Sequence, residues 1–154
     1  PKPLRPLREC ALDALARREH SRFELQRKLV TKGYDSSSVE KELNRLNQEG
    51  LLSDSRFAEA YVHYRSRRGF GPNRVCGELR ERGVDETIIE CTLEALDLDW
   101  SSILDRTWRK KFGRPPKDFQ EKAKHHRFLE YRGFRRENIA RYLSQLQENA
   151  PIES

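Results

Sequence analysis

The feature that most constrains this chain is a motif that recurs every 50 residues. Its shared positions are apolar or glycine, and they fall in columns: Leu29, Leu79 and Leu129; Gly33, Gly83 and Gly133; Val39, Ile89 and Ile139; Leu43, Leu93 and Leu143; Leu46, Leu96 and Leu146. A fixed period of about 20–50 residues is typical of stacked supersecondary units rather than of one closed globule. Such arrays present long surfaces to other macromolecules, so the repeat favours a binding function over a buried catalytic pocket.

Within each copy the apolar residues have helical spacing, and almost no stretch alternates apolar and polar residues as a strand would. Ser21 and Glu24 form the pattern of a capping box that opens a helix, and Gly33 is suited to end it. Pro72 is a suitable first residue of another helix. The aromatic residues Phe23 and Phe119 are expected among the apolar positions of their helices. We therefore predict nine helices in three triplets.

This pattern predicts an all-α fold of three tandem three-helix repeats, about 50 residues each, in an elongated, solenoid-like chain. Charged residues make up 36% of the sequence and apolar residues 35%, so each repeat has a thin core and neighbouring repeats should stack. The regular apolar columns argue against disorder. The expected boundaries are an N-terminal tail over 1–7, repeats over 8–53, 54–98 and 99–148, and a C-terminal tail over 149–154.

The three cysteines, Cys10, Cys76 and Cys91, form no CxxC pair and are most simply small core residues. They indicate a reducing compartment without structural disulfides, so we expect a cytoplasmic protein. No apolar run approaches the roughly 18 residues of a membrane span, and no signal peptide is visible.

Positive charge is concentrated in parts of the chain. Residues 101–154 carry 13 basic and 7 acidic side chains, an excess equal to the net charge of +6. Residues 65–82 hold six arginines against two glutamates, whereas residues 85–99 hold six acids and no base. Such segregation favours a polyanion or an acidic protein groove as partner. The alternative is that each basic cluster is simply a solvated helix face.

Two stretches combine basic and aromatic residues, one from Tyr61 to Arg82 and one from Trp108 to Lys124. Basic side chains could bind phosphates beside stacking aromatic rings. For Tyr61, Trp108 and Phe112, however, helical spacing favours a place in the core. The candidate binding residues are therefore the cations: Arg56, Arg65, Arg67, Arg68, Arg74, Arg109, Lys110, Lys111, Lys117 and Lys124.

No pattern indicates catalysis, a metal or a cofactor. The segment Gly69–Pro72 lacks the preceding strand and the Gly-Lys-Ser/Thr of a phosphate-binding loop, and a helix break explains it. His125 and His126 point about 100° apart on a helix, so they cannot easily share a metal. We expect the histidines, including His20, to face solvent or lie at the boundary of the core. No Ser/His/Asp arrangement marks a nucleophile.

Motifs in all three repeats resemble those of the RecX regulatory family. The residues that carry this resemblance are Leu25, Arg27–Leu29 and Gly33–Tyr34; Gly50–Ala58, Arg65, Gly69–Pro72, Glu78–Leu79 and Gly83–Val84; and Lys122, Arg127–Leu129 and Tyr131–Phe134. The similarity covers about residues 8–146. It implies a curved chain of three helical repeats that modulates RecA, typically by lodging in the groove of the RecA filament. Family members can block strand exchange, ATP hydrolysis and coprotease function, and often bind DNA.

Our leading hypothesis is therefore a non-catalytic, monomeric regulator that binds the RecA nucleoprotein filament. Its further expected partners are single-stranded and double-stranded DNA, with no membrane and no cofactor. The alternative hypothesis is a stand-alone DNA-binding protein built from units that resemble the helix-turn-helix.

Overall fold

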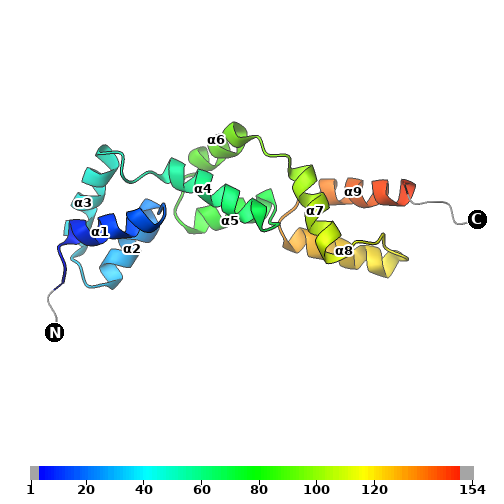
Figure 1. Ribbon diagram of the computed structural model, residues 1–154, viewed down its shortest axis with the longest axis horizontal. Coiled ribbons are helices and arrows are strands. Elements are labelled where there is room, and N and C mark those ends of the chain that lie inside the picture. Colours follow the sequence, from blue (N-terminus) through cyan, green and yellow to red (C-terminus); the bar gives the residue numbers. More distant parts are fainter. Residues whose placement is uncertain (1–3, 150–154) are drawn as a thin grey trace, which may run out of the picture. The chain divides into compact units, whose positions relative to one another are not determined.

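The computed structural model describes residues 4–149, which form nine helices and no strand (Figure 1). The helices are α1 (Leu7–Arg17), α2 (Arg22–Thr31), α3 (Ser36–Gln48), α4 (Asp54–Arg67), α5 (Pro72–Glu81), α6 (Glu86–Leu96), α7 (Trp100–Lys111), α8 (Phe119–Tyr131) and α9 (Arg136–Glu148). The predicted fold class, all-α with three tandem three-helix repeats, is confirmed. The repeat boundaries given above stay predictions, and the expected tails lie partly outside the described residues.

Several helices begin where the sequence offers a cap. The Ser21 hydroxyl accepts a hydrogen bond from the Glu24 amide at 3.1 Å, and the Glu24 carboxylate accepts one from the Ser21 amide at 3.1 Å, so the predicted capping box is present. Pro72 is the first residue of α5, as predicted. Aspartates Asp35, Asp99 and Asp118 cap α3, α7 and α8.

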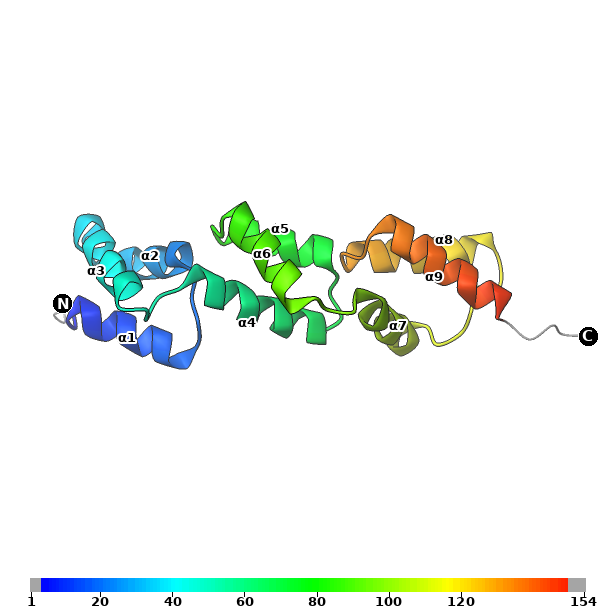
Figure 2. The ribbon, with the colours of Figure 1, turned by 90° about the horizontal axis from the view of Figure 1, so that it is seen from above.

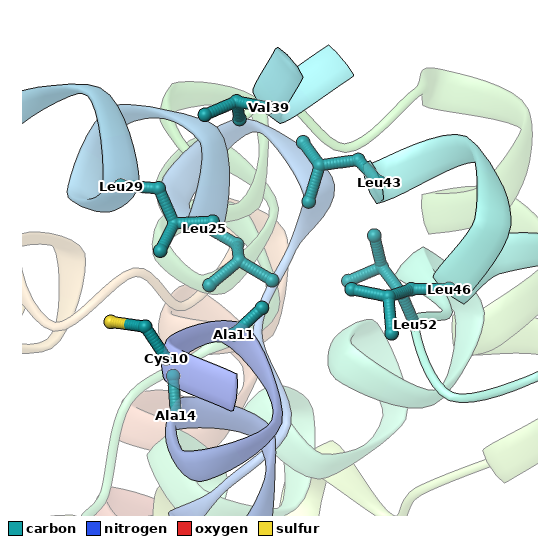
Figure 3. Close-up of a cluster of buried hydrophobic side chains, with 9 residues drawn as sticks. All are labelled: Cys10, Ala11, Ala14, Leu25, Leu29, Val39, Leu43, Leu46 and Leu52. Carbon is teal, nitrogen blue, oxygen red and sulfur yellow. The ribbon is translucent and has the colours of Figure 1, made fainter. Parts of the chain in front are cut away.

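Each of the outer triplets encloses its own small apolar core. In the first, side chains from α1, α2 and α3 meet, as Figure 3 shows: Cys10, Ala11, Ala14, Leu25, Leu29, Val39, Leu43 and Leu46, together with Leu52. In the third, α8 lies beside α9 and both contact α7 (Figure 2). Its buried residues are Ile103, Leu104, Trp108, Leu129, Phe134, Ile139 and Leu143. The apolar columns of the 50-residue motif thus contribute to the cores of the two outer repeats.

Several expectations about individual side chains are wrong. His20 and His125, expected at the surface or boundary, are 1% and 5% exposed. Cys91, expected in the core, is exposed because it faces outward from α6. Phe23 and Phe119, expected on apolar faces, are 44% and 84% exposed. Both phenylalanines lie in the first turn of their helices.

The described residues divide into two compact units. One contains the chain up to Tyr61 together with Glu78–Leu96, and the other contains Val62–Gly77 together with the chain from Asp97 onward. Helices α4 and α5 each contribute residues to both units.

Each unit contains a contact between consecutive repeats, and the two contacts lie 50 positions apart. In the first joint, formed by Ser21, Phe23, Arg82 and Gly83, the Ser21 hydroxyl donates to the Arg82 carbonyl at 2.8 Å. In the second joint, formed by Gly71, Asn73, Arg74, Arg132 and Gly133, the Gly71 amide donates to the Arg132 carbonyl at 2.7 Å and the Asn73 amide to the Gly133 carbonyl at 2.9 Å. The start of one repeat's second helix is therefore bonded to the end of the next repeat's second helix.

A candidate anion-binding cleft

The second unit contains an open cleft of about 440 Å³. Its walls come from three elements that are distant in sequence: the end of α4 with the residues after it, the C-terminal half of α7, and α8 with its C-cap. The lining residues are Ser66, Arg67, Arg68, Gly69, Arg106, Thr107, Lys110, Lys111, Phe128 and Arg132. Six of these ten residues are cationic and none is acidic.

Gly69 brings these elements together. It ends α4 in the left-handed region, with φ +85°, where side chains are strained. A Cβ atom at this position would lie 2.8 Å from the Thr107 hydroxyl, so only glycine lets α7 approach the end of α4 this closely. The Thr107 hydroxyl also lies 3.4 Å from the Gly69 carbonyl. The two basic stretches of the sequence thereby face one hollow.

Aromatic rings and backbone groups hold several of the cations in place. Arg132 donates to the Arg68 carbonyl at 3.2 Å, and its guanidinium lies 4.6 Å from the centre of the Phe70 ring. Arg68 lies 4.7 Å from the Tyr64 ring, and the Lys111 ammonium 5.4 Å from the ring of Phe128. Such contacts orient a cation without neutralising its charge. The cleft is therefore arranged before any ligand arrives.

Among the described residues, no carboxylate forms an ion pair with any of the six cations of the cleft. Arg67, Arg106 and Lys110 are also exposed. Like charges that converge on one hollow create a strong positive potential that favours anions. The cleft is therefore suited to bind phosphate or carboxylate groups.

Of the predicted binding residues, the structure brings four into the cleft: Arg67, Arg68, Lys110 and Lys111. Arg65 and Arg74 belong to the same unit and lie 3.7 and 4.7 Å from the Phe70 ring. Arg74 also donates to the Tyr131 carbonyl at 3.2 Å. These two arginines therefore contribute to the packing around Phe70 next to the cleft.

The other four predicted residues lie elsewhere. In the first unit, Arg56 forms an ion pair with Glu19 at 3.0 Å. Arg109 points from α7 to Asp105 at 2.9 Å, and this hydrogen bond raises the pKa of the Arg109 guanidinium. Lys117 precedes α8 and Lys124 lies within it, and both are exposed. These four cations do not line the cleft.

Asp105 shows how the third repeat neutralises a cation that faces away from the cleft. Burial raises the pKa of its carboxyl group, but hydrogen bonds from Tyr142 at 2.5 Å and from Arg109 outweigh burial and lower it. Burial, followed by the bond to Asp105, raises the pKa of the Tyr142 hydroxyl. Asp105 is therefore ionised at neutral pH and paired with Arg109, whereas the neighbouring Lys110 faces the cleft without an acid.

Two cations of the cleft, Arg106 and Arg132, were not among the predicted binding residues. Arg106 precedes Lys110 by four residues, so helical spacing places both on one face of α7, and that signal could have found it. Arg132 follows α8 as its C-cap and comes from a separate part of the chain. No local pattern relates it to the basic stretch at the end of α4.

Two other kinds of site are absent from the part of the chain that the structure describes. None of its helices has the length and apolar character needed to cross a bilayer. In the same residues, no three histidine, cysteine, aspartate or glutamate side chains lie close enough together to bind a metal ion.

Comparison with protein families identifies all three repeats. The first, second and third three-helix domains of RecX match residues 8–46, 53–93 and 101–143, in that order. The matched ranges agree with the three predicted repeats in number and order.

Whole-chain relatives agree with this result. The regulatory protein RecX of Pseudomonas fluorescens strain SBW25 is 48% identical over 139 residues, which cover 90% of each chain. That of Pseudomonas putida strain GB-1 is 45% identical, over 90% of this chain and 89% of its own. The crystal structure of RecX from Lactobacillus salivarius superimposes with a TM-score of 0.74 over 92% of this chain and 95% of that one, at 20% identity, and so supports the fold. This chain therefore belongs to the RecX family of regulatory proteins.

Proposed function

We propose that this protein regulates RecA by binding the RecA nucleoprotein filament, and that it thereby inhibits recombinase, ATPase and coprotease activities. It acts by binding rather than by catalysis, as a monomer in the cytoplasm. Membership of the RecX family supports the regulatory role. The resemblance of the repeat motifs to that family implies RecA as partner.

The observation that carries the proposal is the cleft of six cations without an acid. A RecA nucleoprotein filament includes a polyanion, because its DNA carries one charge per phosphate. Positive charge steers association with such a partner and supplies contacts that are spread over several side chains. In this proposal Arg67, Arg68, Lys110 and Lys111 contact the filament directly, with Arg65 and Arg74 next to them. Arg109 and Lys117 are proposed as further contacts outside the cleft.

Charge reversal tests this assignment. We expect the paired variants Arg67→Glu/Arg68→Glu and Lys110→Glu/Lys111→Glu to weaken inhibition of the DNA-dependent ATPase of RecA by about tenfold or more in half-inhibitory concentration. Each changes the charge by the same amount as the control Arg135→Glu/Arg141→Glu, which reverses exposed arginines of the third repeat outside the cleft. Circular dichroism checks that all three variants remain helical.

Inhibition that is unchanged in both cleft variants would eliminate the site assignment. A wild-type protein that leaves the RecA ATPase unaffected would eliminate the proposed function itself. A RecA pull-down with and without single-stranded DNA then tells whether the filament or RecA alone is bound.

The alternative is a stand-alone DNA-binding protein with tandem units that resemble the helix-turn-helix, and the same cationic cleft would favour it. It predicts sequence-selective binding to duplex DNA without RecA. A gel shift with random duplex oligonucleotides distinguishes the two, since a RecA regulator needs no sequence preference.

A further inference from the structure

The two joints connect corresponding positions of the repeats but differ in acidic residues. Positions 50 apart correspond at the ends of α1 and α4 and along α2, α5 and α8, which end at Thr31, Glu81 and Tyr131. The first joint is surrounded by three glutamates, Glu19, Glu24 and Glu78. The corresponding residues around the second joint are Gly69, Arg74 and Phe128.

At the first joint two of these acids, Glu19 and Glu24, pair with nearby arginines. Arg56 donates to Glu19 at 3.0 Å, and Arg18 donates to Glu24 at 2.8 Å. The Tyr61 hydroxyl donates to Glu78 at 3.1 Å. The same local fold can therefore carry acids that pair with its cations. The positive cleft at the second joint is a property of its side chains, not of the repeat.

Stabilisation of helix ends does not account for the cleft. Basic residues favour a helix C-terminus, and this explains Arg17 at the end of α1 as well as Arg67 at the end of α4. It does not explain why an acidic residue, Glu19, follows the end of α1, whereas no acidic residue follows the end of α4 before α5 begins. The carbonyls at the end of α4 already have partners, since that of Ser66 accepts from the Gly69 amide at 3.0 Å and that of Arg68 from Arg132. The cations of the cleft are thus available to a ligand.

The dimensions of the cleft fit a compact ligand. About 440 Å³ lies in the range of small-molecule pockets, roughly 300–1,000 Å³. Four arginines offer the planar forks that bind phosphate oxygens in pairs. The six cations surround one hollow, so several of them can contact one short chain of phosphates at the same time. Several phosphates in a short chain match this arrangement.

Among the residues that line the cleft, the one aromatic side chain is Phe128, and other side chains already contact its ring. Lys111 lies 5.4 Å and Arg132 5.2 Å from the ring of Phe128, and Phe112 meets that ring edge-on at 5.4 Å. A nucleobase therefore finds no open ring on which to stack. Recognition in this cleft depends on phosphate groups and not on a base.

From these observations we propose that the cleft binds a compact polyphosphate, meaning a linear chain of two or more phosphates, either inorganic or the triphosphate of a nucleotide. The bound chain links Arg67 and Arg68 at the end of α4 to Arg106 and Lys110 on α7 and to Arg132 after α8. The inference concerns the same cleft as the proposed function but does not involve RecA.

The test is direct binding to the full chain without RecA. Isothermal titration calorimetry with inorganic tripolyphosphate, ATP, GTP and orthophosphate should give a dissociation constant for tripolyphosphate about tenfold or more below that for orthophosphate. ATP and GTP should bind equally, within about twofold, because no base is read. At about a hundred times the dissociation constant, tripolyphosphate should raise the melting temperature by about 5 °C or more.

The variant Arg67→Glu/Lys110→Glu should lose this binding and this shift, while Arg135→Glu/Arg141→Glu keeps both. Equal affinity for tripolyphosphate and orthophosphate, a clear preference between ATP and GTP, or undiminished binding by the cleft variant would overturn the proposal. So would binding of a single-stranded oligonucleotide in the absence of any tripolyphosphate binding. RecA inhibition is measured separately, so failure here leaves the proposed regulatory role standing, and failure there leaves the polyphosphate site standing.

Discussion

At the scale of single residues, glycines decide how closely the repeats approach. Gly133 has φ +100°, and a Cβ atom there would overlap the Cβ atom of Arg74. Gly71 is equally restricted, because its Cβ atom would lie 2.5 Å from the Gly133 carbonyl carbon. Both clashes involve atoms that cannot swing aside. In the glycine column of the sequence, Gly83 and Gly133 thus mark the joints as well as the ends of helices.

We expect Gly133→Ala to lower the free energy of unfolding by about 2–4 kcal/mol, because it combines backbone strain with a steric clash. Gly77→Ala is the matched control. Gly77 lies inside α5, and a Cβ atom added there would meet no other atom within 4 Å, so alanine should stabilise the protein by about 0.5–1 kcal/mol. Urea unfolding monitored by circular dichroism measures both. A neutral Gly133→Ala would refute this account of the second joint.

At the scale of elements, His125 joins α7 to α8. Its Nδ1 atom accepts a hydrogen bond from the Trp108 indole at 3.1 Å, and its ring stacks on Phe112 at 3.7 Å. Burial, with a smaller contribution from Lys124, lowers the pKa of His125, while Glu121 acts in the opposite direction. Protonation would place a hydrogen on the accepting nitrogen, so the contact depends on a neutral imidazole.

This contact predicts a pH dependence of stability. Unfolded histidine titrates near pH 6.5, and the folded pKa lies below that value, so the unfolded chain binds protons first. The contribution of this group to stability is therefore present above about pH 6.5 and is lost as the pH falls below that value, by up to about 1.4 kcal/mol per pH unit. His125→Asn retains an acceptor near Nδ1 without titrating. The melting temperature of this variant should therefore fall less than that of the wild type between about pH 7 and about pH 5. An unchanged slope would contradict the prediction.

The elements themselves could be predicted from the sequence because their signals are local. Ser21 with Glu24, Pro72 and Asp99 define helix starts by chemistry within three or four residues. Some of the side chains that were misplaced depend on distant partners. The exposed Phe23, for example, lies against Gly83, a residue 60 positions later in the chain. Periodicity within one helix cannot indicate which neighbour covers its first turn.

The cleft illustrates the same limit. The sequence indicated two separate basic stretches, and Arg67, Arg68, Lys110 and Lys111 were singled out as a set of cations, although their role stays a prediction. That they share one hollow follows from the contact of Gly69 with Thr107, which is 38 positions away in sequence. Arg132 joins them only because the second joint fixes the end of α8 near the end of α4.

At the scale of the whole molecule, the net charge of +6 has a consequence for stability. Cations that converge in the cleft without an acid repel one another, and at about 0.01 M salt the Debye length of about 30 Å leaves this repulsion largely unscreened. A solvated helix face would spread its charges and cost little. An anion-binding cleft instead lowers the free energy of unfolding until the anion binds, as functional sites often do.

We therefore expect Lys110→Gln to raise the melting temperature by about 1–3 °C at low ionic strength, and the gain to disappear near about 0.5 M sodium chloride. Arg56→Gln is the control of opposite sign, because Arg56 is paired with Glu19 at the first joint, and its loss should leave the melting temperature unchanged or lower. Differential scanning fluorimetry across a salt series separates the two cases. If Lys110→Gln has no effect at low salt, the cations of the cleft are merely solvated, and the case for an anion site at the second joint fails with them.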